Sequence, residues 1–199
     1  MNPEPALRLC GAVALAGVIA VGLPYRLRAQ RVGGKVSRRA EGLGPMIALR
    51  AVAALWALGF VLWLVNPERM RWTEVALPVA VRVVGAALLV AAVPLYAWVF
   101  HHLGLNVTDT VVTRRDATLV RSGPYRFVRH PLYAFGALVL AGWALLTANL
   151  FVAAAGTVAA ALLARRTRIE EAHLIERFGD QYRAYMATTG GFVPRPRRG

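Results

Sequence analysis

Five long apolar blocks dominate the sequence and set the strongest limit on its fold. They cover roughly residues 6–24, 46–65, 75–100, 132–147 and 149–164. The first three reach the ~20 residues that a helix needs to cross a bilayer. Hydrophobic residues make up 57% of the chain and charged residues 17%, against about 25% charged in a soluble domain. The sequence therefore predicts an all-α, polytopic membrane helix bundle and excludes a soluble globule or a disordered chain.

The last two blocks are shorter, and they leave two arrangements open. A helix of about 16 residues is only about 24 Å long. The region is therefore either two short spans extended by flanking helix or a re-entrant hairpin. Small residues at 153–156 and 159–161 favour closely packed helices and hence two spans. The first block lacks an A-x-A cleavage site, so we interpret it as a retained helix, which gives about five transmembrane helices.

Basic residues gather in segments 25–45, 101–131 and 165–199, which alternate correctly for five spans. Segment 66–74 offsets its two arginines with Glu68 and Glu74. The positive-inside rule then places the N-terminus outside and the C-terminus in the cytoplasm, so the polar chemistry gathers at the cytoplasmic face. Lys35 is the one lysine among 24 basic residues, a bias typical of a GC-rich prokaryotic genome and hence of an inner or plasma membrane.

The formal net charge of +14 has two possible meanings. Nucleic-acid binding is one, but no nucleic-acid-binding motif accompanies the charge. Arginines beside apolar spans are better explained by topology and by contact with membrane lipid headgroups. The single cysteine, Cys10, excludes a disulfide framework, and the histidines lack metal-ligand spacing, so no metal site is expected.

The third block contains Arg82, Pro78 and Pro94. An ionisable residue inside a span faces the bundle interior or snorkels to the membrane surface, and both placements fit Arg82. Pro94 is expected to kink the helix.

Two stretches carry the polar chemistry, and the first is residues 119–136. Ser122-Gly123-Pro124 forms a turn. Pro131 suits the first turn of the fourth helix, where its missing N–H costs nothing. His130 then lies at the helix entrance, where free N–H groups favour a carboxylate or phosphate. The neighbouring side chains that suit an anionic ligand with a flat ring are Arg129, Tyr125 and Tyr133.

The second stretch, residues 165–186, is predicted to continue the fifth span as one amphipathic helix. Its apolar face would consist of Leu174, Phe178, Tyr182 and Tyr185. Arg166 and Glu170 are four residues apart and share a face at the membrane boundary. They form either an ordinary surface ion pair or a partly buried pair that holds a polar substrate head or a cofactor cation.

Together the two stretches carry the motifs G-P-Y-x-x-x-R-H-P-x-Y-x-x-G and R-x-x-x-E-E-x-x-L-x-x-x-F-G-x-x-Y-x-x-Y. This combination resembles the isoprenylcysteine carboxyl methyltransferase family. The wider group includes phospholipid N-methyltransferases and bacterial membrane thiol methyltransferases. The resemblance covers about residues 101–194, and the first hundred residues match only in having apolar spans.

The resemblance implies a membrane enzyme that encloses S-adenosylmethionine (SAM) at the cytosolic face without a Rossmann domain. It assigns Leu119, Val120, Gly123 and Tyr125 to the nucleoside, and His130, Pro131 and Tyr133, with Arg129 beside them, to the methionine end. It assigns Glu171, Tyr182 and Tyr185 to closure of the cavity, and Arg166 and Glu170 to the acceptor. For a thiol or amine acceptor, Glu170 or His173 is the expected base.

The chain departs from the family pattern L-G-x-x-W-S after the third span. Leu103-Gly104 is followed by Val107-Thr108 in place of Trp-Ser. We divide the chain into a three-span region, 1–100, and a catalytic half, 101–199, within one bundle. The arginine- and proline-rich tail from Arg195 is expected to be frayed.

Two other functions compete with methyl transfer. Membrane sterol-type reductases, which use NADPH, share a related HPxY segment and C-terminal aromatic element, but the Glu170-Glu171 pair favours methyl transfer. A non-enzymatic membrane scaffold would bind neither cofactor. The expected partners are membrane lipid and a lipophilic or small acceptor, which is open between a carboxylate, a thiol and an amine.

Overall fold

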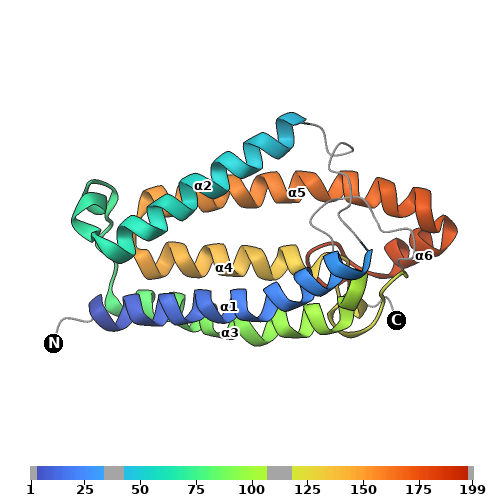
Figure 1. Ribbon diagram of the computed structural model, residues 1–199, viewed down its shortest axis with the longest axis horizontal. Coiled ribbons are helices and arrows are strands. Elements are labelled where there is room, and N and C mark those ends of the chain that lie inside the picture. The colour runs from blue at the N-terminus through green and yellow to red at the C-terminus, as the bar shows by residue number, and fades with distance from the viewer. Residues whose placement is uncertain (1–3, 34–42, 107–117, 197–199) are drawn as a thin grey trace.

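The computed structural model describes residues 4–33, 43–106 and 118–196, and within these ranges it is helical without a strand. The chain forms a polytopic helical bundle (Figure 1). Its α-helices are α1 (Glu4–Gly33), α2 (Leu43–Val65), α3 (Val79–Leu103), α4 (Pro131–Thr147), α5 (Leu150–Phe178) and α6 (Asp180–Thr188). Short 3-10 helices are η2 (Pro67–Thr73), η3 (Gly104–Asn106) and η4 (Gly123–Arg126).

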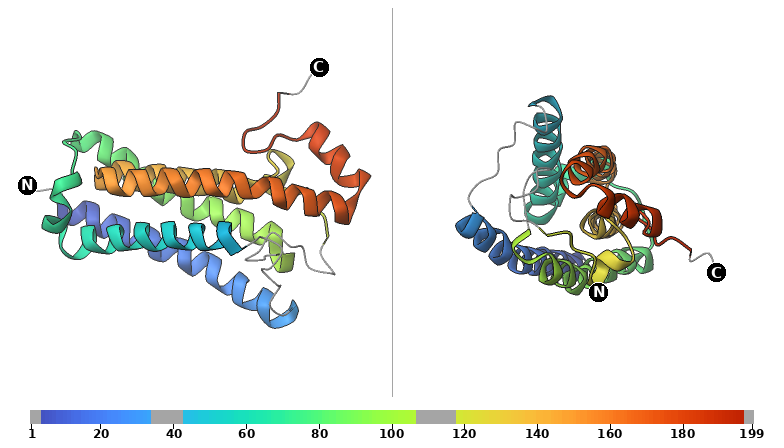
Figure 2. Two further views of the ribbon diagram at one scale, coloured as in Figure 1. Left: turned by 90° about the horizontal axis from the view of Figure 1, so that it is seen from above. Right: turned by 90° about the vertical axis from the view of Figure 1, so that its right-hand side faces the viewer.

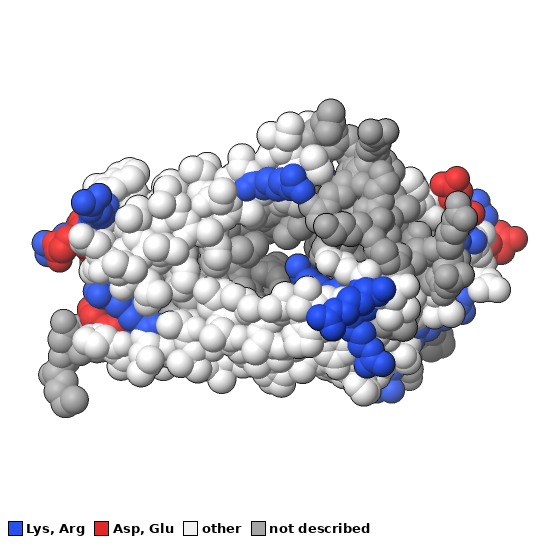
Figure 3. Space-filling model, in the orientation of Figure 1, with Lys and Arg blue, Asp and Glu red and all other residues white. Residues whose placement is uncertain are grey.

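The helices pack in three layers, with α4 in the middle. It lies between the pair α2 and α5 on one side and the pair α1 and α3 on the other (Figures 1 and 2). The two chain ends lie at opposite ends of the bundle (Figure 1). On the face shown in Figure 3, the acidic side chains of the described residues gather at these two ends, and the flank between them carries separate patches of Lys and Arg among uncharged residues.

Four helices, α1, α2, α3 and α5, are long and apolar enough to cross a membrane. The fifth, α4, is apolar but has 17 residues, about 25 Å at 1.5 Å per residue. The predicted all-α membrane bundle is thus confirmed. The two short blocks form two separate helices, and α5 extends well beyond its apolar block, as expected.

Glycines set the closest helix contact, between α3 and α4. A Cβ atom built on Gly85 would lie 2.5 Å from the backbone nitrogen of Leu146 and 2.7 Å from the carbonyl oxygen of Gly142. Only a residue without a side chain permits this approach. A Cβ atom built on Gly156 of α5 would lie 3.6 Å from the Leu140 side chain of α4, an ordinary contact distance. The helices are therefore packed less tightly at this small residue than at Gly85.

An aromatic cluster fills the centre of the bundle. Trp143 on α4 is 1% exposed, and the Phe60 ring contacts it edge-on at 4.4 Å between centroids. Trp56 and Trp63 add further edge contacts at 5.9 Å and 6.4 Å. Trp98 is more exposed and lies against Phe127. The tryptophans therefore tie α2 to α4 and give the layers a fixed spacing.

The α4–α5 turn takes two residues. Ala148 adopts left-handed backbone angles, with φ at 48°. Asn149 is the N-cap of α5, and its side-chain oxygen accepts a hydrogen bond from the Val152 N–H. Its amide donates to the carbonyl of Met70 and the hydroxyl of Thr73, which fixes η2 to the turn.

Arg82 is buried in the first turn of α3 and faces the bundle interior, which is one of its two predicted placements. Its side chain donates to the Leu146 carbonyl at 3.0 Å and forms an ion pair with Glu4 of α1. The helix α3 continues through Pro94 and begins only at Val79, with Pro78 as its N-cap. The apolar block from residue 75 starts four residues before the helix, because residues 75–78 are not helical.

Two other predicted boundaries are wrong. The basic segment from residue 25 was expected to be a loop, but α1 continues as helix to Gly33. The expected continuous helix over 165–186 instead ends at Phe178, because Gly179 adopts φ of 55° and caps it. The helix α6 then starts in a new direction.

The structure describes the segment after α6 as far as residue 196, so Arg197 and Arg198, part of the tail expected to be frayed, lie outside the described residues. The backbone of the described part pairs with Val128 through a parallel bridge at Gly190. Arg195, expected to be frayed, donates to the carbonyls of Met186 and Ala187 at the end of α6.

Candidate active site

Most of the predicted site residues come together at one end of the bundle. Four segments meet there: residues 119–130, the first turn of α4, the second half of α5, and α6 with the tail that follows it. Pro131 is the first residue of α4 and His130 its N-cap, as the sequence predicts. The Ala134 N–H donates to the His130 carbonyl at 3.0 Å, which begins the helix directly at the site.

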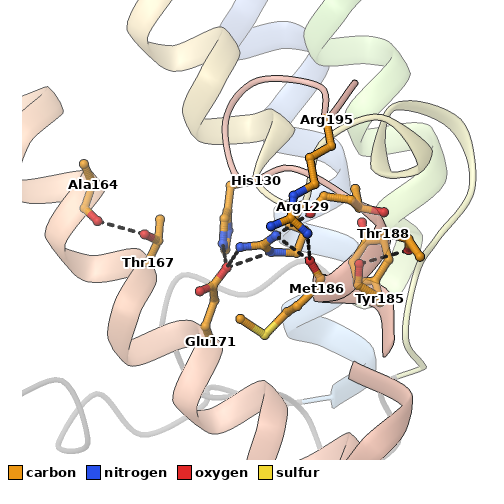
Figure 4. Close-up of polar contacts among 10 residues, drawn as sticks. Arg129, His130, Ala164, Thr167, Glu171, Tyr185, Met186, Thr188 and Arg195 are labelled. Atoms are coloured by element: carbon orange, nitrogen blue, oxygen red, sulfur yellow. Dashed lines mark hydrogen bonds and ion pairs between the residues drawn. The ribbon is translucent and has the colours of Figure 1, made fainter. Parts of the chain in front are cut away.

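Glu171 is the centre of the first polar cluster (Figure 4). Its Oε1 accepts hydrogen bonds from Nε of Arg129 and Nε2 of His130, both at 2.9 Å. An ionised carboxylate only accepts, so His130 donates from Nε2. The His130 side chain is 3% exposed and that of Glu171 is 19% exposed. Within the described residues, Glu171 Oε2 has no hydrogen-bond partner.

Arg129 also forms hydrogen bonds with the C-terminal segment. Its Nη1 donates to the carbonyls of Met186 and Thr189 (Figure 4). The backbone N–H groups of Arg129 and His130 donate to the carbonyls of Gly190 and Gly191 at 2.8 Å and 3.0 Å. Most of the guanidinium is therefore used inside the protein, and Arg129 positions the residues that surround Glu171.

Glu170 is the centre of the second cluster. The Tyr133 hydroxyl on α4 donates to Glu170 Oε2 at 2.9 Å. The sequence predicts that Arg166 is the partner of Glu170, and in the structure its charge lies near enough to the carboxylate to interact with it. Adjacent residues on a helix point about 100° apart, so the two glutamates bind different residues of the α4 entrance.

The residues assigned to the nucleoside lie on the loop before α4. Leu119 and Val120 are half-buried, and Tyr125 is in η4. Gly123 adopts φ of 58°, and a Cβ there would overlap the His102 ring at the end of α3. Gly123 therefore permits both the turn and the close approach of this loop to α3.

The two tyrosines of α6 close the cluster on its far side. The Tyr185 hydroxyl donates to the Tyr125 carbonyl, which joins α6 to η4. Tyr182 is 1% exposed, and its buried hydroxyl has no hydrogen-bond partner among the described residues. Burial raises the pKa of Tyr182 above its ordinary value, so the group is a neutral phenol at physiological pH. An unsatisfied buried hydroxyl is costly and points to a missing partner.

Sequence reasoning missed the contribution of the tail. The Phe192 ring lies 5.7 Å from the His130 ring, and the carbonyls of Gly190 and Gly191 accept hydrogen bonds from the backbone N–H groups of residues 129 and 130. No motif marks these residues, since backbone carbonyls carry no sequence signal. His173, the alternative base, lies 3.6 Å from Glu176 on the same helix. The Val107-Thr108 departure lies outside the described residues, which contain no cluster of three metal-ligating side chains.

The family comparison agrees with this geometry. The sequence model of the phospholipid methyltransferase family matches residues 80–181, from α3 through the start of α6. The chain belongs to this family. The matched range contains Arg129, His130, Tyr133 and both glutamates.

Two curated relatives match a shorter part of the chain. The nickel-cobalt-cadmium resistance protein NccN of Alcaligenes xylosoxydans xylosoxydans is 33% identical over 82 residues. The cobalt-zinc-cadmium resistance protein CzcN of Cupriavidus metallidurans is 37% identical over 83 residues. Each alignment covers 41% of this chain and 38% of the relative. The metal resistance in these names is a property of those proteins.

Proposed function

We propose that the protein transfers a methyl group from SAM to a lipophilic or small acceptor at the cytoplasmic membrane face. The single observation that carries the proposal is the state of the two adjacent carboxylates. Each uses one oxygen within the protein, Glu171 with Arg129 and His130, and Glu170 with Tyr133. The other oxygen of each has no partner among the described residues. Two half-satisfied carboxylates side by side suit a cationic cofactor and an acceptor that carries a proton.

The residues present fit SAM at its charged end. SAM has a sulfonium cation, an ammonium group, a carboxylate and an adenine ring. Glu171 Oε2 suits the ammonium group, with the charge-assisted bond that a carboxylate gives. The unpartnered Tyr182 hydroxyl suits a carboxylate or ribose oxygen, because a neutral phenol donates. The aromatic rings of Tyr133 and Tyr185 suit a cation nearby.

When SAM is bound, its methyl group forms a bond to the acceptor nucleophile while the C–S bond breaks, and sulfur keeps that electron pair. In-line displacement depends mainly on positioning and on exclusion of water. Tyr133 fixes one oxygen of Glu170 and aims the other. That second oxygen is the proposed base for a thiol or amine proton. A carboxylate acceptor needs no base, and the Arg166 charge is then its proposed anchor.

The positive-inside rule supports a cytoplasmic site. The described basic residues at the candidate-site end include Arg26, Arg28, Arg31, Arg121, Arg126, Arg165 and Arg168. The long helices that form the flank of the bundle are apolar enough to cross a membrane, so we place the acceptor's route in the bilayer, entering between helices. The NADPH-dependent reductase is not favoured, because two carboxylates oppose binding of an extra phosphate.

The test is calorimetric titration of the detergent-purified protein with S-adenosylhomocysteine, with NADPH in parallel. Saturable binding of S-adenosylhomocysteine is expected. Glu171→Gln and Tyr182→Phe should each weaken it by about tenfold, the usual effect of one charge-assisted or buried hydrogen bond. Glu176→Gln is the matched control on the same helix, because its side chain is 81% exposed.

A screen for methyl acceptors follows, with methyl-labelled SAM and a membrane lipid extract, small thiols and small amines. Glu170→Gln should lose transfer and keep S-adenosylhomocysteine binding. Binding of NADPH alone would move the protein to the reductases. Binding of neither cofactor by a folded sample would favour a scaffold and overturn the proposal.

A further inference from the structure

A second polar site lies at the opposite end of the bundle from the candidate active site. It is a pocket of about 280 Å³ formed by α1, α3, η2 and the α4–α5 turn. In Figure 1 this is the end at which the N-terminus is marked. None of the residues assigned to methyl transfer lines it, so it needs an explanation of its own.

The inner part of the pocket carries an excess of positive charge. Arg82, which is 7% exposed, pairs with Glu4 through both terminal nitrogens. Arg8 lies one helical turn after Glu4, close enough for the two charges to interact. The Nε of Arg8 is buried and has no hydrogen-bond partner within the described residues. Two arginines thus share one carboxylate, which leaves a net charge of one plus.

The outer part carries the opposite excess. Glu68 and Arg71 pair with each other at 2.8 Å on the exposed rim. The Glu74 carboxylate also lines the pocket and forms no ion pair in the part of the chain that the structure describes. Two carboxylates thus share one arginine there. The pocket is neutral in total, but its charges are separated. One excess positive charge lies in the inner part and one excess negative charge lies in the outer part.

We infer that this pocket binds a small phosphate–ammonium zwitterion, with the phosphate on Arg8 and the ammonium group toward Glu74. A simple anion would be repelled by the carboxylates of the rim, and a simple cation would be repelled by the inner arginines. Arginine binds phosphate through paired N–H groups. The volume is just below the ~300–1,000 Å³ of drug-sized ligand sites, which fits a headgroup-sized ligand. The pocket also lies where membrane helices end, at the depth of lipid headgroups.

Two sources carry this chemistry, an ethanolamine phospholipid and a soluble phosphoethanolamine, and the test separates them. The protein, purified in a maltoside detergent, is titrated with O-phosphoethanolamine and with dihexanoylphosphatidylethanolamine. Trp63, which lines the pocket and is 4% exposed, gives a fluorescence signal beside the calorimetric one. We expect saturable binding of one or both, and no saturable binding of ethanolamine.

Arg8→Gln and Glu74→Gln should each weaken binding by at least about tenfold, because each removes one charge-assisted contact. Arg69→Gln is the matched control: an exposed arginine on the same 3-10 helix that does not line the pocket. The unfolding temperature of each variant without ligand shows that it is folded. Binding of the lipid alone identifies a headgroup site, and binding of O-phosphoethanolamine identifies a site open to soluble ligand.

Three results would overturn the inference. One is the absence of saturable binding of both zwitterions to the folded protein. Another is inorganic phosphate binding as tightly as O-phosphoethanolamine, which would make the pocket a plain anion site. The third is equal loss of affinity in Arg69→Gln and Arg8→Gln. None of these results depends on S-adenosylhomocysteine, so failure here is distinguishable from failure of the proposed methyl transfer.

Discussion

Tyr133 and Glu170 join the first turn of α4 to α5 through a hydrogen bond of 2.9 Å from the phenol to the carboxylate. The two residues are 37 positions apart in sequence. The bond fixes one oxygen of Glu170 and so orients the other. In the next residue, Glu171 is fixed in the same manner by Arg129 and His130. Both carboxylates thus depend on residues around the start of one helix.

Replacement of Tyr133 by phenylalanine should separate positioning from cofactor binding. The ring stays and only the hydroxyl is lost, so Glu170 becomes free to rotate. We expect methyl transfer to an identified acceptor to fall by about tenfold, the value of one charge-assisted hydrogen bond. S-adenosylhomocysteine affinity should change by less than about threefold. The measurement is turnover with labelled SAM beside calorimetry, and an equal loss in both would contradict a positioning role.

The first residue of η4, Gly123, offers a second test with a matched partner. Gly123→Ala places a Cβ against His102 as well as requiring φ of 58°, whereas Gly179→Ala at φ of 55° meets nothing within 4 Å. The strain of the left-handed backbone alone is about 1 kcal/mol. We expect Gly179→Ala to lose about that much stability and Gly123→Ala to lose clearly more, with weaker S-adenosylhomocysteine binding.

A double variant isolates the steric part of that prediction. His102→Ala removes the ring that the new Cβ would meet, so it should restore part of the stability lost in Gly123→Ala. The thermal unfolding temperature in detergent is the measurement. If the stability losses of the two single variants simply add in the double variant, the close approach of the two residues is not the cause of the loss in Gly123→Ala.

The bundle could be predicted from sequence because apolar length is a direct physical requirement of the bilayer. Pro131 at the first turn of α4 and His130 at its N-cap were equally predictable, since proline lacks the N–H that this position does not use. The break between α5 and α6 at Gly179 could not be predicted. Leu174, Phe178, Tyr182 and Tyr185 keep helical spacing across it, and periodicity alone does not reveal a left-handed cap.

The partners of the charged residues were harder to predict than their presence at the site. Spacing on one helix pairs Arg166 with Glu170, but it does not reveal the hydrogen bond from Tyr133 on another helix. Likewise, nothing in the sequence shows that Arg129 binds the carbonyls of Met186 and Thr189. Such contacts depend on how two segments pack, and main-chain acceptors are the same for every residue type.

Arg129→Lys tests whether this arginine holds the tail in place. A lysine provides one point charge and cannot reach Glu171 and two carbonyls together. We expect a loss of roughly 3 kcal/mol in stability, typical of breaking a buried pair, and faster trypsin cleavage after Arg183 in α6. Arg177→Lys, exposed on α5, is the control. Unchanged cleavage in Arg129→Lys would show that the tail is held by its backbone bonds alone.

The contact between α3 and α4 predicts a strong difference between two glycines. Gly85→Ala would place a methyl group 2.5 Å from the Leu146 backbone, where nothing yields easily, whereas Gly44 has no atom within 4 Å. We expect Gly85→Ala to lose several kcal/mol, of the order seen for overpacked cores, or to fail to fold. Gly44→Ala should stay within about 1 kcal/mol of the native protein. Unfolding temperatures of both variants in one detergent decide the question.

The final prediction concerns alkaline pH and the phenol of Tyr185. Burial raises its pKa from 10.0 to about 12. A neutral phenol is therefore favoured in the folded state, so stability is complete below pH 10 and declines as the pH rises from 10 toward 12.

Tyr185→Phe lacks this titration but also lacks the hydrogen bond to the Tyr125 carbonyl. The native protein should be the more stable of the two at pH 9, and the difference should shrink by about 1 kcal/mol at pH 11. Every other tyrosine titrates in both proteins, so the difference in unfolding free energy reports Tyr185 together with its charge coupling to Tyr125 and Tyr182. A difference that stays constant between pH 9 and pH 11 would show that the Tyr185 phenol titrates at its ordinary value.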